Sequence, residues 1–330
     1  MLNTKMTAFN LFVKIVRWQE ALSSKCALLF SALGVQRIFF ISRLTLLARG
    51  FINYVIFSLF NKLKPDETVT ADIHGNKMLI NPKDRGIAPS LLLYGVMEKS
   101  ETKLFKKLID RGMIVVDVGA NIGYYSLIAS SIVGKDGAVY AFEPEELTHK
   151  LLCDNIKLNS RNNIFPVQKA LSNTSGKIQL WVDYAGNAIS SFAKNNVLAF
   201  STSPINNMAE EPRPLTVEKT TLDEFFSKTS YKVDFIKIDT QGAEGLVLAG
   251  AEKILKRNKY LKIIMEFWPE GLKKLGTDPL ELLLKLQDYG FTIKLINETK
   301  QSVEAINPTV FYKQIEAMTG HQEFNLFLEK

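Results

Sequence analysis

From Thr102 onward, short apolar runs alternate with stretches of helical periodicity, and this alternation restricts the fold more than any other feature of the sequence. Near-continuous apolar strands that alternate with helices are typical of a parallel sheet covered by helices on both faces. We therefore expect a doubly wound α/β fold with a mostly parallel sheet. The predicted strands are Ile114–Val118, Ala138–Phe142, Ile164–Gln168, Phe235–Ile238, Leu261–Phe267 and Phe291–Ile296, with Asn325–Glu329 as a closing strand.

The alternation is interrupted between about Leu171 and Ser230. There "SGKIQLWVDYAGNAISSF" predicts a hairpin, and "FSTSPINNMAEEPRPLTVEKT" predicts a long polar loop. Long insertions at the top of such a sheet commonly shape a substrate pocket. We expect residues 177–215 to do so here, including Trp181, Asn187, Ser190 and Ser191.

The chain begins with a basic, apolar segment that differs in composition from the rest. The formal net charge of the chain is +7, and residues 1–64 alone carry +8, so the remaining residues carry −1. After Lys64-Pro65 the segment "TVTADIHGNKMLINP" predicts a β-hairpin that turns at His74-Gly75-Asn76. We expect three parts: a helical appendage at 1–64, a hairpin lead-in at 65–101, and a main domain at 102–330 with an insertion at about 172–230.

Residues 1–64 contain no uncharged apolar run of about 18 residues, the length that a spanning helix requires. Two interpretations stay open for this appendage: helices that lie on a membrane surface, or helices that pack on the main domain or on a second subunit. The two cysteines have no metal-binding or disulfide spacing, so we predict a cytoplasmic protein, with 1–64 at the inner face of the membrane in the first interpretation. Because the main domain is not basic, a nucleic-acid partner is not expected. The oligomeric state stays open.

Four acidic residues fall at or just past the ends of predicted strands. Asp117 ends the first, Glu143 and Asp239 follow the second and fourth, and Glu266 lies near the end of the fifth. The carboxyl ends of parallel strands meet at one edge of the sheet, so we expect these acids to line one crevice. A single strand-end acid is often only a helix N-cap, and this alternative stays open for Asp239.

The loop "DVGANIG" indicates which ligand this crevice takes. Phosphates favour bare amides and the positive end of a helix dipole, and Asp117 would repel them. An adenosine that carries a sulfonium and an ammonium but no phosphate would be attracted, which predicts S-adenosylmethionine. Gly119 and Gly123 allow close approach of the backbone, and Glu143 is placed to accept hydrogen bonds from both ribose hydroxyls. Loop spacing alone does not separate this from an NAD site; Asp117 together with Asn121 does.

Three motifs, "VVDVGANIGYYSL", "VYAFEP" and "DFIKIDTQGAEGLVLAGA", resemble in order and spacing the FkbM family of S-adenosylmethionine-dependent methyltransferases, over roughly residues 68–300. The resemblance implies a class I, Rossmann-like methyltransferase fold and O-methylation of sugar or natural-product hydroxyls. "GVMEKSETKLF" is similar to the lead-in of the family and places Glu98 at an acidic position that we assign to cofactor binding. Gln241 departs from the family, which commonly has Glu there.

An alcohol is a poor nucleophile until its proton leaves, so methyl transfer to a hydroxyl requires a nearby base or a metal. We predict Asp239 as the first candidate base, Glu266 as the second and Glu244 as an assisting acid, with no metal site assigned. Glu244 as a first-turn helix acid and Glu266 as a structural acid bonded to loop amides are the alternatives. The expected partner is a hydroxylated small molecule or glycan; a non-catalytic binding or scaffold module is the second hypothesis, and an NAD-linked oxidoreductase the third.

Overall fold

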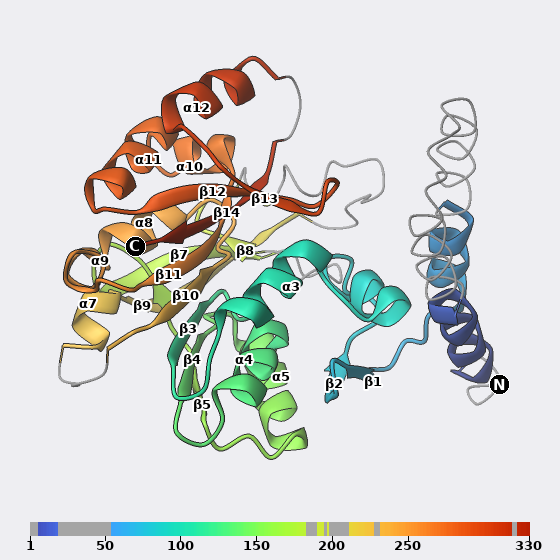
Figure 1. The fold of residues 1–330 in the computed structure, drawn as a ribbon. Helices are drawn as coiled ribbons and strands as arrows, with labels where there is room; N and C mark the ends of the chain where they lie inside the picture. The colour runs from blue at the N-terminus through green and yellow to red at the C-terminus, as the bar shows by residue number, and fades with distance from the viewer. Residues whose placement is uncertain are drawn as a thin grey trace, which may run out of the picture. The chain divides into compact units, whose positions relative to one another are not determined.

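The structure, a computed structural model, describes residues 6–18, 54–182, 190–194, 197, 211–227, 232–318 and 322–330 (Figure 1). The chain divides into two compact units, Met1–Met97 and Glu98–Lys330. The boundaries expected near residues 64 and 101 stay predictions. Asn187, expected to help shape the pocket, lies outside the described residues.

The first unit contains two helical segments, residues 6–18 and 54–63, followed by the predicted hairpin and one wide helical turn. The Phe9 and Phe60 rings pack with their centroids 5.7 Å apart, which joins the two helices. The guanidinium of Arg17 donates to the carbonyls of Leu91 and Leu92, at 2.8 and 3.0 Å, and so joins the first helix to the turn. The elements are β1 (Val69–Ile73), β2 (Asn76–Ile80) and η1 (Ser90–Tyr94). Among the described residues, none of the helices has the length and apolar character that crossing a membrane requires.

The second unit is built on an eight-stranded sheet in the order β13-β12-β14-β11-β10-β3-β4-β5. Five neighbouring strands are parallel, and β14 pairs antiparallel with both β11 and β12. The predicted doubly wound, mostly parallel sheet is therefore confirmed. The strands are β3 (Ile114–Val118), β4 (Ala138–Phe142), β5 (Ile164–Val167), β10 (Phe235–Ile238), β11 (Lys262–Phe267), β12 (Thr292–Asn297), β13 (Ser302–Ala305) and β14 (Phe324–Glu329). Three of these match their predicted bounds, three differ from them by one residue at one end, and β12 differs by one residue at each end; β13 was not predicted.

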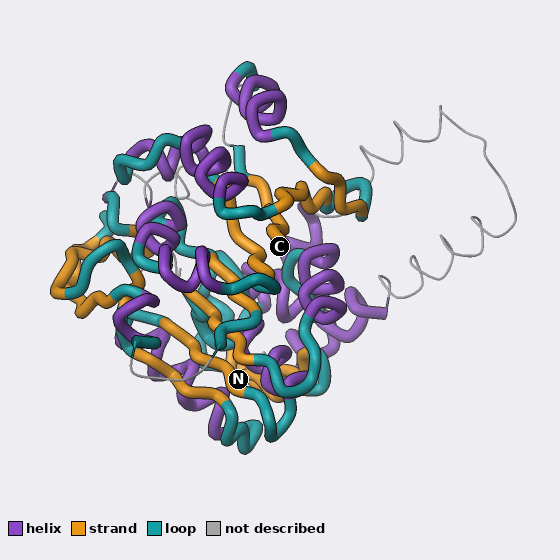
Figure 2. The backbone as a smooth tube through the Cα atoms, turned by 60° about the vertical axis from the view of Figure 1, so that its left-hand side comes forward, coloured by secondary structure: helices purple, strands orange, loops and turns teal. Residues whose placement is uncertain are grey.

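Helices cover both faces of this sheet, as Figure 1 and the turned view of Figure 2 show. The core lies largely between the sheet and the later helices, where Ile238, Met265, Leu283 and Leu328 are fully buried. The local sequence explains where two of these helices begin. Asp278 caps α11 and Asn307 caps α12, and each helix has a proline at its first position. The helices are α3 (Lys99–Leu108), α4 (Tyr124–Val133), α5 (Glu146–Leu158), α7 (Leu222–Phe225), α8 (Glu244–Ala249), α9 (Glu252–Arg257), α10 (Pro269–Lys274), α11 (Pro279–Asp288) and α12 (Pro308–Glu316).

A separate four-stranded sheet, in the order β6-β9-β7-β8, corresponds to the interruption in the alternation. The predicted hairpin is present, since β7 pairs antiparallel with β8. The prediction of a polar loop is wrong for its last eight residues, which form β9 and pair along the whole of β7. Pro214 in this strand and Pro212 just before it obscured β9, in which Val217 is buried. The strands are β6 (Ala170–Leu171), β7 (Gly176–Val182), β8 (Ser190–Ser191) and β9 (Arg213–Thr220).

Candidate functional site

The site lies at the carboxyl end of β3, where the strand order reverses. β4 lies on one side of β3 and β10 lies on the other, although β10 begins more than 90 residues after the end of β4. In open α/β sheets, ligands bind in the crevice at such a switch point. The predicted edge is confirmed: the segments that carry Asp117, Glu143, Asp239 and Glu266 end at this side of the sheet.

The loop from Gly119 to Gly123 is a tight turn with several residues in the left-handed region. Gly119, Asn121 and Gly123 have φ values of 77°, 51° and 93°. The amides of Gly119 and Ala120 both donate to the carbonyl of Phe142, at 3.0 and 2.9 Å. A Cβ on Gly119 would lie 1.9 Å from the carbonyl oxygen of Asp239, so this glycine brings the β3 and β10 loops into direct contact.

Glu143 connects the same loop to the end of β4. Its two carboxylate oxygens accept hydrogen bonds from the amides of Asn121 and Glu145, both at 3.0 Å. A carboxylate has about four acceptor positions, so each oxygen retains capacity for one more donor. This geometry fits the predicted contact with two ribose hydroxyls.

Asp117 lies inside the protein, with 2% of its surface exposed. Its Oδ2 accepts a hydrogen bond of 2.5 Å from Ser126 on α4, a partner that the sequence did not reveal. Burial raises the pKa of Asp117 to about 6, against the opposing effects of Ser126 and Lys237. This hydrogen bond joins the end of β3 to α4, and Asp117 offers little free surface.

The turn after β10 brings two of the predicted catalytic acids together. The Gln241 amide donates to Oδ1 of Asp239 at 3.2 Å and to both oxygens of Glu266 at 3.3 Å. Gln241 thus serves as an uncharged donor between two carboxylates, at the position where the family resemblance led us to expect an acid. Ser191 of β8 donates to the Gln241 carbonyl at 2.9 Å, which connects the inserted sheet to this turn.

Asp239 and Glu266 differ in exposure and charge. The side chain of Asp239 is 30% exposed, whereas Glu266 is buried. Burial, with added repulsion from Asp239 and Glu244, raises the pKa of Glu266 well above its ordinary value. The N-cap alternative for Asp239 is wrong, because α8 begins at Glu244 with Ala243 as its N-cap. The intervening turn has left-handed residues at Gln241 and Gly242, which keep Asp239 out of the helix.

Glu244 faces the turn itself. Its Oε1 accepts from the amide and hydroxyl of Thr240, both at 3.0 Å, and from the amide of Gly242 at 3.1 Å. The side chain is fully buried, and burial raises its pKa to about 7. This arrangement supports the loop, and Glu244 lies in the first turn of α8, as the alternative for this residue expects.

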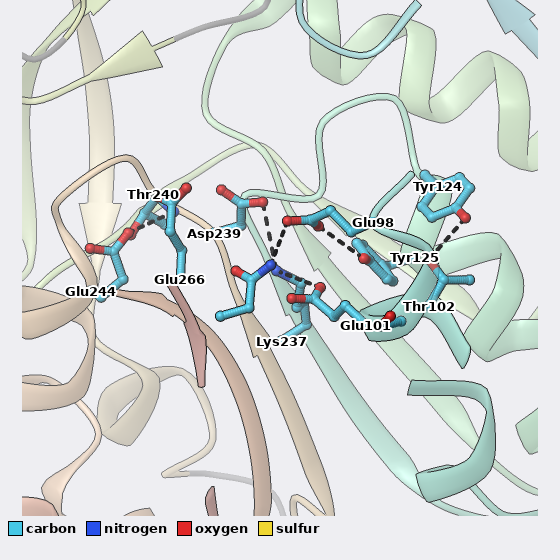
Figure 3. A network of polar contacts seen from close by, with 12 residues as sticks. Glu98, Glu101, Thr102, Tyr124, Tyr125, Lys237, Asp239, Thr240, Glu244 and Glu266 are labelled. Atoms are coloured by element: carbon cyan, nitrogen blue, oxygen red, sulfur yellow. Dashed lines mark hydrogen bonds and ion pairs between the residues drawn. The ribbon is translucent and has the colours of Figure 1, made fainter. Parts of the chain in front are cut away.

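Glu98 closes the other side of the site, at the start of α3. Its Oε1 accepts from Asn325 at 2.6 Å and its Oε2 from the Tyr125 hydroxyl at 3.1 Å. Asn325 is the register partner of Glu266 on β11, so Glu98 belongs to the same edge of the sheet. Figure 3 shows Asp239 between the Glu98 group on one side and the Glu244 and Glu266 group on the other. In the described part of the chain, no group of three or more His, Cys, Asp or Glu residues is arranged to hold a metal ion.

Glu143 leads to a prediction on stability. Burial is the main cause that raises its pKa, from 4.5 to about 7. The folded state therefore retains a proton that the unfolded state loses between these pH values, and stability falls with pH there, by at most about 1.4 kcal/mol per pH unit. In urea unfolding, the free energy of unfolding of Glu143→Gln minus that of wild type should rise from pH 4.5 to pH 7. For Glu146→Gln, whose side chain is exposed in wild type, this difference should not change with pH. A difference that does not change with pH for Glu143→Gln would contradict the assignment.

The doubly wound, mostly parallel sheet is the architecture of class I methyltransferases, and the comparison with protein families assigns the domain to that class. Residues 117–293 match the family model described as the methyltransferase FkbM domain. The chain therefore belongs to the FkbM family of methyltransferases, whose cofactor is S-adenosylmethionine.

A curated relative is the tRNA(Phe) (4-demethylwyosine(37)-C(7)) aminocarboxypropyltransferase of Methanocaldococcus jannaschii, 36% identical over 67 residues. That alignment covers 20% of this chain and 26% of the relative. Among solved structures, a SAM-dependent methyltransferase from Aquifex aeolicus is 18% identical with a TM-score of 0.37, over 73% of this chain and 93% of that one. Aeropyrum pernix fibrillarin with natively bound S-adenosylmethionine is 14% identical with a TM-score of 0.38, over 70% and 74% of the two chains.

Proposed function

We propose that the protein transfers a methyl group from S-adenosylmethionine to a hydroxyl group of a sugar, glycan or related small molecule. The observation that carries this proposal is Asp239, whose partly exposed carboxylate lies at the cofactor crevice while Asp117, Glu244 and Glu266 are buried. A reaction at an alcohol requires a proton acceptor within reach of the reacting oxygen. Of the three predicted catalytic acids, Asp239 is the one whose side chain is partly exposed and therefore open to an acceptor.

Bound S-adenosylmethionine supplies an electrophilic methyl group. Asp117, Gly119, Asn121, Gly123, Glu143 and Glu98 are the residues that we assign to hold it. The Asp239 carboxylate accepts the proton of the acceptor hydroxyl as the oxygen bonds to the methyl carbon and the carbon–sulfur bond breaks. Gln241 keeps Asp239 and Glu266 apart and oriented through its amide. We assign Glu266 a supporting role in proton transfer, because its raised pKa favours the protonated form, and Glu244 the support of the turn.

The test is methyl transfer from ¹³C-methyl S-adenosylmethionine to pooled sugars, lipid-linked sugars and natural-product alcohols, with NMR assignment of the atom that receives the label. We expect O-methyl products. Label found only on nitrogen or carbon would contradict the proposal. RNA is included in the pool because the curated relative acts on tRNA. Label found only on RNA would contradict a sugar acceptor and indicate a nucleic-acid acceptor instead. Cofactor binding without transfer to any acceptor would favour the non-catalytic module.

We also propose that residues 1–64 bind anionic membrane surfaces. Leu11, Ile15 and Trp18 form an exposed apolar stripe along the first helix, and Lys14 on the same helix is exposed. Together with the charge of +8, this suits an acidic lipid surface. Serine at Leu11, Ile15 and Trp18 together should abolish flotation of the full chain with anionic vesicles, whereas Val310→Ser, exposed on α12, should not. Equal flotation of the triple variant and wild type would count against this proposal.

A further inference from the structure

Lys237 is a buried cation in the middle of an apolar strand. It lies on β10, between β3 and β11, in register with Asp117 and Ile264. Its side chain is 1% exposed, and the neighbouring residues Ile236 and Ile238 are fully buried hydrophobic residues. Removing an ammonium from water has a large desolvation cost, which only close partners offset. The proposed reaction gives this lysine no direct part.

Two carboxylates of unequal exposure surround the ammonium. Nζ lies 3.2 Å from Oε1 of Glu101 and 3.6 Å from Oδ2 of Asp239. Glu101 is fully buried on α3, whereas Asp239 is 30% exposed at the crevice. The ammonium also lies 5.1 Å from the centroid of the Tyr125 ring, which fixes it from a third side. Figure 3 shows Lys237 between Glu101 and Asp239. The cation therefore connects the sealed interior to the proposed base.

The electrostatic balance around Lys237 favours a permanent charge. Burial lowers its pKa, but Glu101 and Asp239 more than offset this, and the net pKa is raised. Burial, with repulsion from Glu98, raises the pKa of Glu101 to about 8, against the opposing effect of Lys237. Asp117 also faces this ammonium from β3, and Glu266 from β11. Asp239 is then the exposed carboxylate in closest contact with the cation.

We propose that Lys237 is a positioning residue for methyl transfer: its ion pair with Asp239 keeps that carboxylate turned toward the acceptor, and Glu101 holds the cation in place. The inference rests on the proposed role of Asp239 as base. With 1% exposure Lys237 does not reach the acceptor, so it acts through Asp239 alone.

The test measures the titration of Asp239 directly, by NMR of protein labelled with ¹³C at the aspartate carboxyl carbon and assigned with Asp239→Asn. Loss of an adjacent cation disfavours an ionised carboxyl group, so in Lys237→Met we expect the carboxyl signal of Asp239 to titrate at higher pH than in wild type. The acidic limb of the kcat/KM profile should move by the same amount. Lys237→Arg should restore the wild-type titration. Lys262→Met, a partly buried lysine on β11 that donates to the Leu108 carbonyl, is the matched control and should change neither.

If Lys237→Met does not fold, the double variant Lys237→Met/Glu101→Met serves instead, because it leaves no unpaired buried charge from the ion pair. A folded variant in which Asp239 titrates as in wild type overturns the inference. An ion pair between Lys237 and Glu101 that serves only the fold would give that result together with a lower melting temperature. The NMR titration needs no acceptor and no turnover. Absence of methyl transfer by wild type would therefore refute the proposed function separately.

Discussion

Asp239→Asn should lower kcat for methyl transfer by about 10²- to 10⁴-fold, the usual contribution of a positioned general base. The substitution keeps the size of the side chain and leaves an oxygen to accept from Gln241, whose amide lies 3.2 Å from Oδ1 of Asp239. Because Asp239 faces the acceptor side of the crevice in our assignment, affinity for S-adenosylhomocysteine should stay at the wild-type level. Steady-state kinetics and calorimetry on the same preparation measure both quantities.

The matched control for this variant is Asp136→Asn, an exposed aspartate in the turn before β4. It should retain wild-type kcat and affinity. A kcat within a few-fold of wild type in Asp239→Asn would remove Asp239 as the base, and Glu266→Gln would then be the variant to measure. A loss of S-adenosylhomocysteine affinity equal to the loss of kcat would instead assign Asp239 to cofactor binding.

Gly119→Ala should both destabilise the protein and abolish S-adenosylhomocysteine binding. The backbone of Gly119 has a φ of 77°, and an added Cβ would lie 1.9 Å from the carbonyl oxygen of Asp239. Left-handed strain and forced overpacking together should lower the free energy of unfolding by about 2–5 kcal/mol. The clash is with backbone, so it is relieved only if the β3 loop moves away from the β10 turn, and the crevice is then deformed.

Gly112→Ala separates the two causes. Gly112 has a φ of 81°, and nothing lies within 4 Å of its added Cβ. It should therefore show only the left-handed strain, about 1–2 kcal/mol in urea unfolding, with unchanged S-adenosylhomocysteine affinity. Equal effects of the two substitutions would mean that the contact between the β3 loop and Asp239 has no role in the site.

The sheet was predictable because its central strands are buried on both faces. β3, β4 and β10 are short, nearly continuous apolar runs, and their bounds match the predictions. β9 was missed because Pro214 and the alternating polar residues are typical of a loop, and only pairing with β7 makes it a strand. The role of Gln241 was also hidden, because its amide finds Asp239 and Glu266 through a left-handed turn that local sequence does not specify.

The acids of the site were predictable from strand ends, whereas their partners were not. Ser126 follows Asp117 by nine residues and Asn325 follows Glu98 by 227, and only the folded chain brings these pairs together. Lys237 did leave a signal, since a lysine inside "DFIKID" interrupts a strand that is otherwise fully apolar. A charged residue at the centre of a buried strand requires a partner of opposite charge, and one of the partners of Lys237 is Asp239, the proposed base.

Calorimetric titration of the full chain with S-adenosylhomocysteine, with NADH as the comparison ligand, tests most directly whether the acid-lined crevice is the cofactor site. We expect one molecule of S-adenosylhomocysteine to bind, with no heat from NADH, and we expect binding to be lost in Asp117→Ala. Binding of NADH in place of S-adenosylhomocysteine, or unchanged affinity in a folded Asp117→Ala variant, would contradict the assignment of this crevice.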